Sequence, residues 1–85
     1  MNEMSLSVRN IAKDTLLFEV RDVITQKPLF ATIELFSIAA KEGFALQTDS
    51  LGIATIKKTQ DLQMLKATAL AYRSLTIDVS RLKGL

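Results

Sequence analysis

This chain is built from short runs in which apolar and polar residues alternate, separated by segments rich in turn-forming residues. The clearest run, 75–80, reads Leu-Thr-Ile-Asp-Val-Ser, and the run 15–22 reads Thr-Leu-Leu-Phe-Glu-Val-Arg-Asp. Successive side chains of a β-strand point to opposite faces, so a period of two predicts half-buried strands. A chain dominated by such runs favours a β-sheet fold.

Further runs with partial alternation or several β-branched residues are expected to be strands as well. They are 4–8, 29–36, 44–49, 53–56 and 65–71. Turn signals separate them about every ten residues, which is typical of an antiparallel sandwich or barrel. Residues 10–14 and 57–63 are expected to be connections. We therefore predict an all-β fold, an antiparallel sandwich of seven strands.

Two segments leave an α+β alternative open. Residues 30–42 are rich in Ala, Leu and Glu and are followed by Gly43, as at the end of a capped helix. Residues 60–72 have apolar side chains at helical spacing, and Thr59 could cap that helix. Under this alternative the chain is a small cytoplasmic α+β module that oligomerises through the apolar faces of its two helices.

Length and composition limit both the architecture and the chemistry. Eighty-five residues suffice for one domain. We expect an N-terminal segment or edge strand at 1–14, the sandwich at 15–80 and a tail at 81–85. The chain has no cysteine and no histidine, which excludes disulfides, thiolate nucleophiles, His-based triads and nearly all zinc sites. The three glycines are isolated, so no phosphate-binding loop is present. We expect no enzyme activity, no metal and no cofactor.

Charge and hydropathy argue against two further classes of partner, nucleic acids and membranes. Eleven Lys and Arg against nine Asp and Glu leave a net charge of +2, and the cations are scattered, which argues against nucleic-acid binding. The acidic residues, such as Glu34 and Asp61, lie on polar faces or in turns and are expected to be solvated. No apolar stretch approaches the ~20 residues that span a bilayer, and 1–14 lacks the apolar core of a signal peptide. We expect no insertion into a membrane.

Four short motifs occur in order along most of the chain. The first, V-x-D-x-x-T-x-x-P-L-x-A-x-I-x-L, starts at Val20, and the second, T-D-x-x-G-x-A-x-I, starts at Thr48. The third, L-x-A-x-A-x-A-Y, starts at Leu65, and the last, L-x-I-x-V, starts at Leu75. Together they resemble the carboxypeptidase regulatory-like domains.

The resemblance implies a prealbumin-like (transthyretin-like, Ig-like) sandwich that acts as an accessory domain without catalysis. Such domains serve as spacers, folding aids or protein-binding modules of cell-envelope and secreted proteins. The partner would be another protein or a domain of the same polypeptide, self-association is possible, and the location would be periplasmic or at the cell surface. The chain departs from the family at Gln26 and Ala71, where the family has glycine. The turn at Gln26 is therefore expected to adopt another type.

Four residues are expected to shape turns. Pro28 would start a strand where no donor is needed, and the Asp49 side chain would cap the turn that ends at Gly52. Gly52 would take the positive φ of a tight turn. Tyr72 would bury its ring while its hydroxyl reaches a backbone acceptor, as in a tyrosine corner.

Two phenylalanines are the candidate partner patch. Phe30 and Phe36 alternate with the apolar residues Ala31, Ile33 and Leu35, so their side chains are expected on the opposite face of that strand. The second face of the strand is then also partly apolar. The face is either covered by the N-terminal segment or exposed to a partner.

Overall fold

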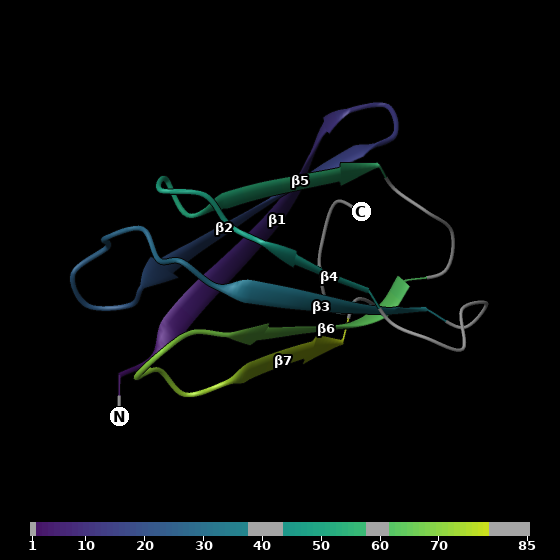
Figure 1. Ribbon diagram of the computed structural model, residues 1–85. Coiled ribbons are helices and arrows are strands. Elements are labelled where there is room, and N and C mark those ends of the chain that lie inside the picture. The colour runs from purple at the N-terminus through teal and green to yellow at the C-terminus, as the bar shows by residue number, and fades with distance from the viewer. Residues whose placement is uncertain (1, 38–43, 58–61, 79–85) are drawn as a thin grey trace.

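A computed structural model describes residues 2–37, 44–57 and 62–78 of the chain (Figure 1). These residues form strands and no helix. The strands are β1 (Met4–Ala12), β2 (Thr15–Asp22), β3 (Thr32–Ser37), β4 (Phe44–Gln47), β5 (Ile53–Lys57), β6 (Leu62–Thr68) and β7 (Leu75–Asp78). The described ranges accordingly contain no helix able to cross a membrane.

The strands form two antiparallel sheets. The first has the order β1-β2-β5 and the second the order β4-β3-β6-β7. The chain changes sheet between β2 and β3, between β4 and β5, and between β5 and β6, while β1-β2, β3-β4 and β6-β7 are neighbours within one sheet. The predicted all-β antiparallel fold is confirmed.

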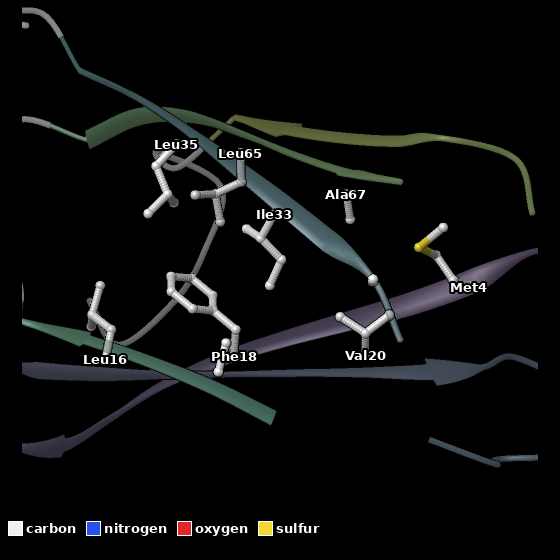
Figure 2. Packing of buried hydrophobic residues seen from close by; sticks show 10 residues of the cluster. Met4, Leu16, Phe18, Val20, Ile33, Leu35, Leu65 and Ala67 are labelled. Carbon is white, nitrogen blue, oxygen red and sulfur yellow. The ribbon is translucent and has the colours of Figure 1, made fainter. Parts of the chain in front are cut away.

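The core lies between the two sheets. In β2, Leu16, Phe18 and Val20 alternate with partly exposed residues and point toward the second sheet (Figure 2). Side chains of β3 and β6 meet them from the other side, among them Ile33 and Leu65. Burying one such side chain stabilises the folded state by about 1.5–3 kcal/mol, which is more than an exposed ion pair does. Contact between the apolar faces is therefore what holds the two sheets together.

The helical alternative is wrong for the described residues. Within 30–42, residues 32–37 are strand β3, which pairs with β4 on one side and β6 on the other. Within 60–72, residues 62–68 are strand β6. The rest of these two segments includes 38–42, 60 and 61, which lie outside the described residues, as does the expected tail at 81–85.

Several element boundaries differ from the expectation. Strand β1 continues to Ala12, with a register shift between Asn10 and Ala12, so Lys13 and Asp14 are all that remain of the expected connection. Strand β6 already starts at Leu62, within the expected 57–63 connection. Both extensions follow from pairing with a neighbouring strand, which overrides the local polarity of the segment.

Pro28 does not start β3, contrary to the expectation. It forms an isolated antiparallel bridge with Arg21, and the next amide, that of Leu29, donates to the Val20 carbonyl at 3.1 Å. The chain therefore returns along β2 in the first sheet before it crosses over, and β3 begins only at Thr32.

Three loops gather at one end of the sandwich. They are the β2–β3 loop (23–31), the β4–β5 loop (48–52) and the β6–β7 loop (69–74), and they lie at the left of Figure 1 together with the N-terminus. The β1–β2 hairpin lies at the opposite end. Residues from distant parts of the sequence thus share one surface.

Candidate functional site

Exposed apolar side chains concentrate on these three loops. The described residues include seven large hydrophobic residues that are exposed, and all but Ile11 and Met64 lie at this end. Ile24 is 89% exposed, Leu70 96%, Phe30 73% and Leu51 61%. Single exposed apolar residues are common on proteins, whereas large contiguous apolar patches are typical of surfaces that bind a partner. We name this set the loop-end surface; its members are Val23, Ile24, Phe30, Leu51 and Leu70.

The Asp22 carboxylate ties the β2–β3 loop to the β6–β7 loop. Its Oδ1 accepts hydrogen bonds from the amides of Ile24 at 2.7 Å and Thr25 at 2.9 Å. Its Oδ2 accepts a 2.5 Å hydrogen bond from the hydroxyl of Tyr72. Asp22 is buried, so this charge is held by protein donors in place of water.

These hydrogen bonds set the ionisation of both side chains. The Tyr72 hydroxyl, followed by the amides of Thr25 and Ile24, holds the pKa of Asp22 below its ordinary value. The hydrogen bond to Asp22 in turn raises the pKa of Tyr72. At neutral pH the pair is therefore an ionised carboxylate and a neutral phenol, joined by a charge-assisted hydrogen bond.

The expected backbone acceptor for Tyr72 is wrong, because its partner is the Asp22 side chain. Both residues stand in the motifs quoted above, but they are fifty positions apart in the sequence. Nothing in the alternation of either segment indicates that they meet. Only the crossing of the chain between sheets brings them together.

The β2–β3 loop is also closed by its own backbone. The amide of Asp22 donates to the Lys27 carbonyl at 2.9 Å, and the amide of Gln26 donates to the Asp22 carbonyl at 3.0 Å. The Arg21 guanidinium donates to the Gln26 carbonyl at 2.7 Å. Gln26 has a φ of 62° and Ala71 a φ of 66°, the left-handed region that favours glycine. Gln26 and Ala71 therefore both have a backbone φ that glycine adopts at lower cost than other residues.

Thr48 fixes the backbone on both sides of Phe30. Its hydroxyl accepts a hydrogen bond from the amide of Ala31 at 2.8 Å and donates one to the Leu29 carbonyl at 2.7 Å. Its own amide donates to the Ala31 carbonyl at 3.0 Å. Thr48 is buried, so these bonds are shielded from water. This role is not apparent from the sequence, where Thr48 is only the first letter of a motif.

Asp49 and Gly52 shape the loop that carries Leu51. Asp49 Oδ1 accepts hydrogen bonds from the amides of Leu51 at 2.9 Å and Ile53 at 3.0 Å. Gly52 has a φ of 73°, and a Cβ on it would lie 2.5 Å from the carbonyl oxygen of Val20. The amide of Val20 donates to the Gly52 carbonyl at 2.8 Å. The β4–β5 loop is thereby packed directly against β2, with no room for a side chain at position 52.

Residues at the N-terminus connect two of the loops. The Glu3 carbonyl accepts a hydrogen bond from the amide of Val23 at 3.1 Å, and the Asn2 carbonyl accepts one from the amide of Arg73 at 2.9 Å. An exposed ion pair between Arg73 and Glu3, 3.8 Å long, adds little. The three loops and this segment therefore form one hydrogen-bonded unit.

The structure separates the two phenylalanines of the candidate patch. Phe30 lies in the β2–β3 loop, whereas Phe36 is half-buried within β3, where its cross-strand partner on β6 is Met64. Thr32 and Glu34 lie between them on the same face. Strand β1 belongs to the opposite sheet, so it does not cover this face. Phe30 joins the loop-end surface, and Phe36 does not.

The loop-end surface presents apolar side chains to solvent. Next to it, the carboxylate of Asp22 and the hydroxyls of Thr48 and Tyr72 are engaged in internal hydrogen bonds. In the ranges that the structure describes, no three acidic side chains are grouped as metal ligands would be.

Comparison of the chain with protein-family models, with characterised proteins and with solved structures found no match.

Proposed function

We propose that this chain is a non-catalytic, prealbumin-like interaction domain that binds another protein, or another domain of its own polypeptide, through the loop-end surface. One observation carries the proposal. Apolar side chains from three loops are held out toward solvent by backbones that Asp22 and Thr48 tie to one another, while Asp49 closes its own loop. A spacer alone would gain nothing from keeping these side chains exposed.

Energetics favour binding at a surface of this kind. Covering apolar area gains about 25 cal/mol per Å². Ordering side chains and loops on binding makes the free energy of association less favourable, by roughly 0.5–1.5 kcal/mol for each immobilised side chain. Loops that are already fixed avoid part of that loss. In immunoglobulin variable domains, sandwich loops at one end likewise form the binding site.

The resemblance to carboxypeptidase regulatory-like domains supports the setting that we propose, a cell-envelope or secreted protein. Gln26 and Ala71, where that family has glycine, both have positive φ, so the backbone at these positions has the shape that glycine favours. The cytoplasmic helical module has no support in the described residues, because both of its helices are replaced there by strands.

Selection from a phage-displayed library of random peptides tests the proposal. The selected peptides are then assayed against Ile24→Asp and Leu51→Asp, which place a charge on the loop-end surface, and against Ile11→Asp as a matched control at an exposed residue of β1. We expect the peptides to bind the parent and the control, and to lose binding to both loop variants. Failure to enrich any peptide, or equal binding to all variants, would contradict the proposal.

A further inference from the structure

A pocket of about 380 Å³ opens beside Phe30, where β4, β3 and β6 reach the loop end. Phe30 and Leu70 are its most exposed lining residues and form apolar walls. The volume is at the small end of the range for ligand sites, about 300–1,000 Å³. It therefore suits one large side chain with its adjoining main chain.

The floor of the pocket is a row of uncharged hydrogen-bonding side chains. Gln47 of β4 and Thr68 of β6 are both direct cross-strand partners of Thr32 in β3, so the three lie side by side across the sheet. Their neighbours Ile33 and Ala67 are buried, which places the three on the outer face. Within the described part of the chain, none of the three side chains has a hydrogen-bond partner. Their amide and hydroxyl groups are free to meet a ligand.

Among the residues that the structure describes, none of those that line the pocket is charged. On the same face, the next row of the sheet carries Glu34 and Lys66, which are cross-strand partners of opposite charge. A charged ligand would lose its hydration in the pocket without gaining a counter-charge. The occupant that matches this lining is neutral, with an apolar part for the walls and polar groups for the row beneath.

The backbone around Phe30 is already fixed before any ligand arrives. Thr48 holds the residues on both sides of it through the Leu29 carbonyl and the Ala31 amide. Little ordering of the chain is then required on binding, and a pre-organised anchor site is what a protein hot spot needs.

We propose that this pocket takes an extended, uncharged segment of another protein. One large apolar side chain of that segment inserts between Phe30 and Leu70, and its main-chain amides hydrogen-bond to Thr32, Gln47 and Thr68. The proposal rests on the proposed function and identifies the part of the loop end that holds the anchor.

The test is an NMR titration of the ¹⁵N-labelled chain with N-acetyl-leucinamide, which carries one apolar side chain and two amides. Saturating shifts are expected at millimolar concentration for the amides of Phe30, Thr32, Thr68 and Leu70. N-acetyl-lysinamide, with the same amides and a charged side chain, should shift them far less. Leu70→Asp should weaken binding by about tenfold or more, whereas Ile11→Asp should leave it unchanged.

Leu70 is almost fully exposed, so the variant is expected to fold, and its spectrum shows whether it does. Thr68→Val, which replaces a hydroxyl by a methyl group, gives a second test and should weaken binding without loss of the fold. Shifts with maltose and none with N-acetyl-leucinamide would instead assign the pocket to a sugar and overturn the proposal. Absence of any shift would overturn it too.

The two proposals fail separately. If selected peptides depend on Ile24 and Leu51 while the Phe30 pocket responds to nothing, the loop-end surface binds protein but the anchor lies elsewhere. If the pocket binds N-acetyl-leucinamide while no peptide depends on the loop variants, the pocket stands and the wider surface does not.

Discussion

The hydroxyl of Tyr72 donates a hydrogen bond to Oδ2 of Asp22, while Oδ1 of the same carboxylate holds the amides of Ile24 and Thr25. One buried side chain thus joins the loop that leaves β2 to the loop that leaves β6. Because β2 and β6 belong to different sheets, the hydrogen bond between Asp22 and Tyr72 also links the sheets at this end.

Removal of the Tyr72 hydroxyl should loosen both loops. In Tyr72→Phe the ring stays, but the carboxylate of Asp22 loses the hydroxyl donor and its charge is stabilised less. We expect a lower melting temperature and faster hydrogen exchange at the amides of Ile24 and Thr25. Ser74→Ala, an exposed change in the same loop, is the control. Equal exchange in Tyr72→Phe and parent would show that the bond does not order the loop.

The same pair predicts how stability depends on pH. The pKa of Asp22 is lowered in the folded chain from its ordinary 3.8, so its contribution is present above that pH and is lost as the pH falls through the folded value. The pKa of Tyr72 is raised from 10.0, so its contribution is present below pH 10 and is lost as the pH rises through the folded value. NMR titration of Asp22 should give a higher pKa in Tyr72→Phe than in the parent. An unchanged value would exclude the hydroxyl as the main cause.

Thr48→Val should destabilise the chain although the two side chains have similar shapes. The buried Ala31 amide and Leu29 carbonyl would each lose a partner, at a cost of about 1–3 kcal/mol for an unsatisfied group. Thr48→Ser keeps the hydroxyl and should recover most of that loss. Urea unfolding measures both variants, and a Val variant as stable as the parent would contradict the assigned role.

Gly52→Ala should reduce the free energy of unfolding by about 1–3 kcal/mol. The added Cβ would need positive φ and would lie too close to the Val20 carbonyl oxygen. Thermal melting of the variant beside the parent measures the effect. Identical melting curves would mean that the β4–β5 loop is not packed on β2 as described.

The reverse substitution should stabilise the chain at Ala71. A residue other than glycine in the left-handed region costs about 1–2 kcal/mol, and the greater freedom of glycine in the unfolded chain offsets only about 0.5–1 kcal/mol of that. Ala71→Gly is therefore expected to raise the free energy of unfolding, measured with denaturant, by up to about 1 kcal/mol. Gln26→Gly should gain less, because the Gln26 side chain donates a 3.0 Å hydrogen bond to the Val23 carbonyl, which the glycine lacks. A larger gain at Gln26 would contradict this ordering.

The fold class was predictable where one face of a strand is buried. Strand β2 alternates so regularly, with Leu16, Phe18 and Val20 facing the core, that the sequence alone predicts its bounds correctly. Strand β3 was ambiguous, because its Leu, Phe and Glu residues also suit a helix. Pairing with β4 and β6 makes this segment a strand and not a helix. Such pairing between distant segments cannot be recognised from the spacing of apolar residues within one segment.

The candidate site was predictable only in part. The sequence indicates Phe30, an apolar residue that alternates with the apolar positions of its run, but it gives no comparable indication for Ile24, Leu51 and Leu70. Each is a lone apolar residue inside a turn, and their common location follows from the topology of the loops. A large apolar side chain beside turn residues, as in Ser-Leu-Gly at 50–52, is the signal that could have found them.

Binding through the loop-end surface, as proposed, requires loops that are ordered before a partner arrives. Backbone ¹⁵N relaxation of 23–31, 48–52 and 69–74 measures that order directly. We predict order parameters near those of the strands, about 0.85. Values below about 0.6 throughout these loops would mean that the apolar side chains are presented by moving chain, and that the preformed loop-end surface does not exist.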